Sequence, residues 1–243
     1  MVSMVRYENI ERLVIFDADG TTIDSFHAIE MAFMQHGMDI GDIDRFQKRR
    51  KLFKFLGGLR EFPANLRQQF GKQSRKRLLE TLTEVYRHEA YLYPGIASLL
   101  RLLLDAPDIR VGLVTRNVTN APEETLKRLF HRHGIDVGEF DYFACIHLRE
   151  NKTVHLQRAR QSFAINPARG YACGDEYSDY LAAINAGMHP FVVSYGFEDN
   201  IRLTEKFGVP GEVISTSPEE FIDRLLHALD LTADLSRVIG HQH

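Results

Sequence analysis

The sequence predicts an α/β fold in which a doubly wound, parallel, Rossmann-like sheet carries an inserted all-helical cap domain. Three observations predict it. Short apolar runs end in polar turns, helix-length segments separate most of these runs, and residues 26–93 show helical patterns but no strand. The chain has 243 residues, 44% of them hydrophobic, which is enough for a buried core.

The expected strands are continuous apolar runs, which is typical of strands buried on both faces of a parallel sheet. The first is Leu13–Phe16, and it stops at Asp17-Ala18-Asp19-Gly20. The later runs are Arg110–Val114, Tyr142–Ile146, Gly170–Cys173, Pro190–Val193 and Val213-Ile214.

The expected core helices lie between and after these runs. Helix-start signals support two of them: Pro122-Glu123-Glu124 opens one, and Ser217 is a good N-cap for another. The helices are Ala97–Leu104, Ala121–His133, Thr153–Phe163, Ser178–Ala186, Asn200–Phe207 and Pro218–Leu229. This alternation of strand and helix favours a parallel, doubly wound sheet.

The inserted stretch contains several helical patterns, and Pro94-Gly95 marks the return to alternation. The patterns are Phe26–His36, Ile43–Phe55, Pro63–Phe70 and Ser74–His88. The predicted domains are therefore an α/β core, residues 1–25 and 94–243, and a helical cap, residues 26–93.

Composition excludes several classes of protein. Two cysteines cannot build a disulfide framework, and no apolar run reaches the roughly 18 residues that a membrane helix needs. Residues 1–12 lack the apolar core of a signal peptide, so a cytoplasmic location and no membrane partner are expected. The sequence leaves the oligomeric state open.

The candidate site residues follow the apolar runs, because ligands of doubly wound folds bind outside the carboxyl ends of the strands. They are Asp17, Asp19, Thr115, Asp175 and Asp179, with Lys152 near a helix start. Carboxylates gathered at one edge are tolerable around a hard cation such as Mg²⁺. With a hydroxyl and an ammonium group, such a set suits a phosphoryl group, with one Asp as nucleophile and a second as general acid/base.

At this point the sequence resembles a known family. The segment from Phe16 to Ser25, FDADGTTIDS, is similar to the first motif of the haloacid dehalogenase-like hydrolases in its phosphatase form. Leu113-Val114-Thr115 resembles the second motif, Lys152 the third, and Gly174–Asp179 the fourth. The insert resembles the helical cap of phosphoglycolate phosphatase-like and β-phosphoglucomutase-like members.

The resemblance implies a role for each matched residue. Asp17 would attack phosphorus, and Asp19 would protonate the leaving oxygen and then activate water. Thr115 and Lys152 would hold the phosphate, and the Gly20 turn would bring backbone N–H groups to it. The magnesium ligands would be Asp17, Asp19 through its carbonyl, Asp175 and Asp179.

Two departures from the family pattern add candidates. Arg116 and Asn117 follow Thr115, where relatives often carry Asn or Ser and a small residue, and either could reach the phosphate or the substrate. Arg116 could equally be solvated. Thr153 follows Lys152 where Pro is frequent, so the nearby Arg149 is an alternative phosphate ligand.

The near-neutral total charge of −3 hides a basic segment. Residues 45–77 contain twelve Lys and Arg but one acid, Glu61, so this segment carries +11 and the remainder −14. These charges are either a solvated surface or a surface that attracts an anionic substrate. Arg60, in a Gly57-Gly58 break, is a candidate substrate contact. Nucleic acid is not an expected partner, because no recognisable binding motif is present.

The predicted function is a Mg²⁺-dependent phosphatase that hydrolyses a small phosphorylated metabolite through an aspartyl-phosphate intermediate. Two alternatives stay open: a phosphomutase of the same superfamily, and a non-catalytic protein that binds phosphate or a polyanion on the same fold. The sequence does not identify the substrate.

Overall fold

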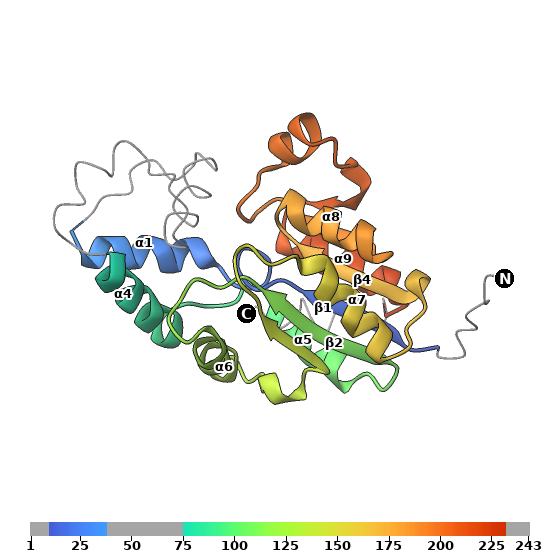
Figure 1. Ribbon diagram of the computed structural model, residues 1–243, viewed down its shortest axis with the longest axis horizontal. Coiled ribbons are helices and arrows are strands. Elements are labelled where there is room, and N and C mark those ends of the chain that lie inside the picture. The colour runs from blue at the N-terminus through green and yellow to red at the C-terminus, as the bar shows by residue number, and fades with distance from the viewer. Residues whose placement is uncertain (1–9, 38–74, 232–243) are drawn as a thin grey trace.

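The computed structural model describes residues 10–37 and 75–231, and its centre is a parallel sheet (Figure 1). Six strands in the described residues pair in the order β3-β2-β1-β4-β5-β6, and every pairing is parallel. The strands are β1 (Arg12–Phe16), β2 (Ile109–Thr115), β3 (Tyr142–Cys145), β4 (Gly170–Gly174), β5 (His189–Val193) and β6 (Ile214–Ser215). The predicted α/β class with a parallel sheet is confirmed.

The helices alternate with these strands after residue 95, as the sequence predicts. The α-helices are α1 (Ser25–Gln35), α4 (Arg75–His88), α5 (Ile96–Asp105), α6 (Pro122–Arg132), α7 (Lys152–Ser162), α8 (Tyr177–Ala186) and α9 (Pro218–Ala228). Short helical segments are η1 (Val137–Glu139), η2 (Pro167–Arg169), η3 (Arg202–Lys206) and η4 (Gly211–Val213). No helix in the described ranges is both long and apolar enough to cross a bilayer.

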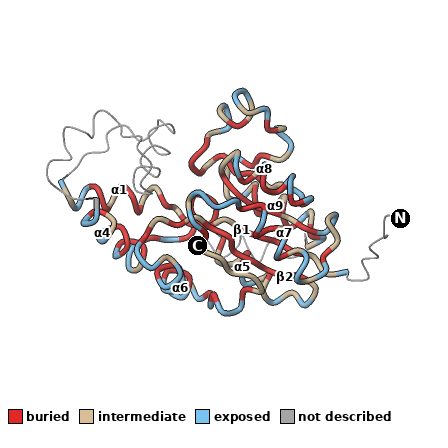
Figure 2. Tube along the Cα trace, viewed as in Figure 1, coloured by how far each residue is buried: buried red, intermediate tan, exposed pale blue. Residues whose placement is uncertain are grey.

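Helices cover both faces of the sheet, which is why its strands β1, β2 and β4 are mostly buried (Figure 2). Alternate residues of β1 show the division, since successive side chains of a strand point to opposite faces. Val14 and Phe16 belong to a cluster with α5, α6 and α9, whereas Leu13 and Ile15 pack with α7 and α8. β1 therefore lies in the middle of the core.

The helices at the two ends of the predicted cap pack against each other beside the sheet (Figure 1). These are α1 and α4, which match the predicted helices Phe26–His36 and Ser74–His88. The other two, Ile43–Phe55 and Pro63–Phe70, lie outside the described residues. The division into core and cap therefore stays a prediction.

A side chain of the core holds the end of α4. The Arg132 guanidinium, on α6, donates to the carbonyls of His88 at 2.9 Å and Tyr86 at 3.3 Å, and also to that of Ala90. These carbonyls lie in the last turn of α4 and just beyond it, where helical partners run out. The C-terminal end of α4 is thus tied to α6.

One predicted helix has a different geometry. Asn200–Phe207 is expected to form a helix, and the structure has the π-helical segment η3 there, with wider turns. The Val209 amide donates to the carbonyl of Leu203 and the Gly208 amide to that of Thr204, so Gly208 ends the segment with φ +67°. Periodicity cannot separate these helix types over so few residues.

Phe221 on α9 offers a test of the core. Its ring meets that of Phe16 edge-on at 6.3 Å between centroids, and both side chains are fully buried. We expect Phe221→Ala to lower the free energy of unfolding by about 3–5 kcal/mol, because a cavity replaces the ring. Urea denaturation measures this change. The matched control is Ile184→Ala on the exposed side of α8, with an expected change within about 0.5 kcal/mol.

Candidate active site

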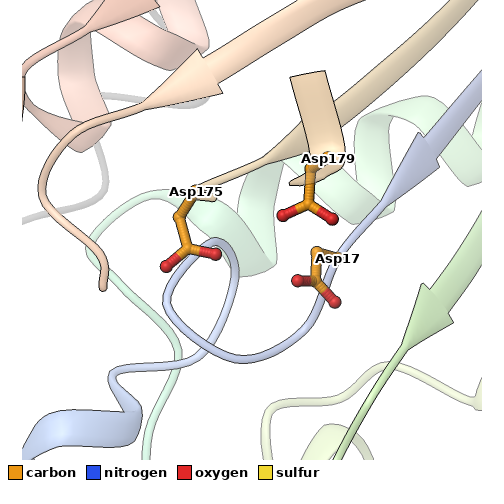
Figure 3. A group of neighbouring side chains, drawn as sticks. All are labelled: Asp17, Asp175 and Asp179. Atoms are coloured by element: carbon orange, nitrogen blue, oxygen red, sulfur yellow. The ribbon is translucent and has the colours of Figure 1, made fainter. Parts of the chain in front are cut away.

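Three aspartates meet at the carboxyl ends of the two central strands β1 and β4 (Figure 3). Asp17 follows β1, Asp175 follows β4, and Asp179 lies in the first turn of α8. One carboxylate oxygen from each lies within 4.8 Å of the others. The side chains of Asp17 and Asp179 are only 12% and 6% exposed, so this is a buried group of acids.

Local backbone structure places each acid. The Asp17 amide donates to the carbonyl of Cys173 at 2.9 Å, which extends the pairing of β1 and β4 beyond the strands. Asp179 is part of a capping box at the start of α8, where its Oδ2 accepts from the Glu176 amide at 3.1 Å. The acids therefore sit on rigid strand ends and a helix start rather than on free loops.

Lys152 brings a positive charge into this group. It is the first residue of α7, just after the N-cap Asn151, and its side chain is 5% exposed. Its Nζ lies 3.2 Å from Asp17 Oδ2 and 2.7 Å from Asp179 Oδ1. A buried ammonium needs such partners, because desolvation otherwise favours its neutral form.

Burial dominates the protonation equilibria of the site. It raises the pKa of Asp17 to about 6 despite the opposing charge of Lys152. It also raises the pKa of Asp175 well above its usual range, and the charges of Asp17 and Asp179 add to this effect. Burial by itself lowers the pKa of Lys152, but Asp17 and Asp179 outweigh it and the pKa is raised. The ammonium therefore stays charged.

Asp19 has different surroundings from Asp17, although only Ala18 separates them. Its carboxylate lies near three neutral donors: Tyr86 Oη, 2.6 Å from Oδ1, Ser25 Oγ, 3.0 Å from Oδ1, and Asn117 Nδ2, 3.0 Å from Oδ2. Burial raises the pKa of Asp19 to about 6, although the hydrogen bond from Tyr86 opposes the shift. No ammonium or guanidinium group contacts this carboxylate among the described residues.

Besides Asp179 Oδ1, which is ion-paired with Lys152, two buried oxygen atoms at the site lack a hydrogen-bond partner within residues 10–37 and 75–231. They are Asp175 Oδ1 and Thr115 Oγ1. The other oxygen of Asp175, Oδ2, accepts from the Phe197 amide at 2.5 Å. Buried polar atoms are normally satisfied, so both atoms point to a ligand. The carboxylates of Asp17, Asp175 and Asp179 are hard oxygen donors, and Oδ1 of Asp175 has no hydrogen-bond partner in the described residues. This set of donors fits a cation such as Mg²⁺.

Two glycines enclose Asp175. A Cβ on Gly20, whose φ is +80°, would lie 2.3 Å from Asp175 Oδ2. A Cβ on Gly196 would lie 2.4 Å from the same oxygen and 2.4 Å from the Gly20 carbonyl oxygen. Both positions therefore require glycine, since any side chain would displace the carboxylate.

The other residues predicted to contact phosphate or substrate, Arg116, Asn117 and Gly20, make hydrogen bonds within the protein. Arg116 is half-buried and donates to Ser178 Oγ and the Glu150 carbonyl, both at 3.2 Å. Asn117 donates to Asp19, and its Oδ1 accepts from the Thr119 amide at 2.9 Å. The Gly20 amide, expected near the phosphate, donates within its own turn to Ser25 Oγ and the Ile23 carbonyl, both at 3.0 Å. Their substrate contacts stay predictions.

The other basic candidates differ in position from Lys152. Arg149, the alternative to Lys152 as phosphate ligand, is exposed, whereas Lys152 is buried among the acids. Arg60 and most of the basic segment lie outside the described residues.

Sequence reasoning missed Tyr86, Gly196 and Phe197 as parts of the site. Tyr86 comes from α4, far from the motifs in sequence, and no local pattern marks it. Gly196 follows β5 in Ser194-Tyr195-Gly196, so its place after a strand was the available signal.

The described residues thus place a buried cluster of acids and a lysine at the carboxyl edge of a parallel, Rossmann-like sheet. A match to the haloacid dehalogenase-like hydrolases covers residues 11–187. The chain belongs to this family, which confirms the resemblance read from its motifs and the expectation of an enzyme.

Individual relatives agree with this assignment. Phosphoglycolate phosphatase of Vibrio vulnificus strain YJ016 is 26% identical over 233 residues, which cover 90% of this chain and 95% of that protein. A family hydrolase from Deinococcus radiodurans, solved with bound phosphate and sodium, matches with a TM-score of 0.63 at 17% identity, covering 93% and 99% of the chains. A haloacid dehalogenase-like family protein from Streptococcus pneumoniae matches with a TM-score of 0.58 at 19% sequence identity. The match covers 88% of this chain and 98% of that protein.

The glycine enclosure generates a test. We expect Gly196→Ala to lower the free energy of unfolding by at least about 2 kcal/mol, because its Cβ would overlap Asp175 and the Gly20 backbone. The matched control is Gly211→Ala, where no atom lies within 4 Å of the added Cβ, and a small gain of about 0.5 kcal/mol is expected. Equal denaturant midpoints for the two variants would contradict the enclosure.

Proposed function

We propose that this protein is a Mg²⁺-dependent phosphatase that hydrolyses a small phosphorylated metabolite through an aspartyl-phosphate intermediate. The observation that carries the proposal is the contrast between two aspartates separated by one residue. Asp17 lies against the Lys152 ammonium, whereas Asp19 is held by neutral donors. Two neighbouring carboxyls in unlike environments are suited to different roles in one reaction.

In the first step the Asp17 carboxylate attacks phosphorus. The bond from phosphorus to the leaving oxygen breaks, and the leaving oxygen takes the proton of the Asp19 carboxyl. The alcohol leaves, Asp17 carries the phosphoryl group, and Asp19 is ionised. The raised pKa of Asp19, about 6, suits a group that must both give and take a proton near neutral pH.

In the second step water attacks the phosphorus of the aspartyl-phosphate. Asp19 takes a proton from this water, the phosphorus–Asp17 bond breaks, and inorganic phosphate leaves. Asp17 is again a carboxylate and Asp19 is again protonated. Atoms and charges balance over the two steps, so no other reactant is needed.

Lys152 and Thr115 are assigned to the phosphate itself. The Lys152 ammonium is fixed by Asp17 and Asp179 before substrate arrives, so its charge is preorganised for a phosphoryl group. The Thr115 hydroxyl is buried at the end of β2 without a protein partner in the described ranges, which leaves it free to donate to a phosphate oxygen.

Asp17, Asp175 and Asp179 would hold the magnesium ion, with the Asp19 carbonyl as a further ligand. The ion would offset the charge of the three carboxylates and of the phosphoryl group. The unsatisfied Oδ1 of Asp175 supports this assignment. Asp179 Oδ2 already accepts a hydrogen bond from the Glu176 amide. The oxygen of Asp179 that would bind the ion is therefore Oδ1, which contacts the Lys152 ammonium.

The relatives support a small phosphate ester as substrate. Four curated relatives from Vibrio bear the name phosphoglycolate phosphatase, at 25–26% identity. A cytoplasmic site of action fits this chemistry. A phosphomutase would use the same residues, and it would produce an isomerised sugar phosphate without free phosphate, so a phosphate-release assay distinguishes the two.

The nucleophile assignment is tested with Asp17→Asn. We expect the release of inorganic phosphate from a panel of phosphate esters with Mg²⁺ to fall at least about a thousandfold, because the amide cannot form the phosphoenzyme. The matched control, Asp223→Asn, removes an exposed carboxylate on α9 and keeps wild-type turnover. Activity that persists in Asp17→Asn would exclude Asp17 as nucleophile.

Magnesium binding is tested without turnover. A free Mg²⁺ concentration of about 100 times the dissociation constant stabilises the folded protein by about 2.7 kcal/mol. This stabilisation raises Tm by roughly 5–10 °C. We expect Asp175→Asn to abolish most of this rise but not to lower the Tm in EDTA, because it removes one of three repelling buried carboxylates. An undiminished rise in this variant would exclude Asp175 as a ligand.

A further inference from the structure

We propose that Tyr86 is a positioning residue that fixes the carboxyl of Asp19, so that Oδ2 is the oxygen that gives and takes the proton. This inference rests on the proposed function, since it assigns the atom through which Asp19 acts. Tyr86 lies outside the four motifs, on helix α4, and is 67 residues away from Asp19 in the chain.

The hydrogen bond between the two side chains is short and fully enclosed. Tyr86 Oη lies 2.6 Å from Asp19 Oδ1, Tyr86 is 0% exposed and Asp19 is 3% exposed. In such surroundings water cannot replace the hydroxyl, so the bond restrains the carboxyl strongly. A phenol hydroxyl also has one rotatable proton, which can point only at one acceptor.

The two oxygens of Asp19 are not equivalent. Oδ1 lies within hydrogen-bond distance of two hydroxyls, those of Tyr86 and Ser25, which match its two lone pairs. Oδ2 has one donor, the Asn117 amide. One lone pair of Oδ2 is therefore left for the proton that goes to the leaving oxygen and later comes from water.

Tyr86 is itself rigidly held. Its helix packs on α1, its ring is part of the main core cluster, and its carbonyl accepts from Arg132 on α6. The residues that restrain Asp19 thus come from three places: α1 for Ser25, α4 for Tyr86, and the segment after β2 for Asn117. Removing the Tyr86 hydroxyl leaves Oδ1 with the Ser25 hydroxyl alone, and the carboxyl can then turn or carry its proton on Oδ1 instead of Oδ2.

The test compares two phosphate esters with different leaving groups in Tyr86→Phe. β-Glycerophosphate needs its alkoxide leaving oxygen protonated, whereas 4-nitrophenyl phosphate releases a stable phenolate. We expect kcat/KM for β-glycerophosphate to fall about 10- to 100-fold, and that for 4-nitrophenyl phosphate to change less than about threefold. kcat/KM is the proper quantity, because it reports phosphoryl transfer rather than later hydrolysis of the intermediate.

Two controls separate positioning from a structural effect. Tyr171→Phe removes a hydroxyl that donates to the Ala228 carbonyl at 3.2 Å, at the opposite end of β4, and both kcat/KM values stay at the wild-type level. In an Asp19→Asn background, adding Tyr86→Phe leaves the ratio of the two kcat/KM values unchanged, because Tyr86 acts through Asp19. If Tyr86→Phe does not fold, Tyr86→Met carries the same comparison.

Three results would overturn the inference: equal losses on both esters, no loss on β-glycerophosphate, or an altered ratio in the Asp19→Asn background. They differ from a failure of the proposed function, which appears as a wild-type protein that releases phosphate from neither ester or as full activity of Asp17→Asn.

Discussion

The structure of the site depends on one buried ammonium group. Lys152 lies between Asp17 and Asp179, and its charge makes the burial of these two acids tolerable. Isolated charges at this depth would be neutralised by proton uptake or release. Because α7 begins at Lys152, the charge is fixed by the backbone of the helix start, and the arrangement of the strand ends is held around it.

The position of β1 explains why so few residues build so much of the site. β1 lies between β2 and β4, so the loop after it adjoins the loops after both neighbours. Asp17 turns toward β4 and α7, while Asp19 sits among side chains from α1, α4 and the segment after β2. A single intervening residue, Ala18, therefore separates two electrostatic environments.

Much of this arrangement could be predicted from the sequence. Four site residues follow apolar runs or lie at helix starts, and parallel topology brings such positions to the carboxyl edge of the sheet. They are Asp17, Lys152, Asp175 and Asp179. The contacts of Asn117 could not be predicted, because a side chain two residues beyond a strand end can turn toward a ligand or toward another side chain. Tyr86 could not be found either, since its role depends on how α4 packs against α1. The π-helical geometry of η3 could not be predicted, because hydrophobic periodicity over five residues does not distinguish a π-helix from an α-helix.

The central strand also has a kinetic consequence for folding. β1, Arg12–Phe16, pairs with Ile109–Leu113 on one side and with Gly170–Cys173 on the other. β1 is therefore synthesised about a hundred residues before its first partner strand, and longer still before its second. Such long loop closures slow folding. During synthesis, the apolar strand β1 lacks both partner strands until β4 has been made, and unpaired strand edges promote aggregation.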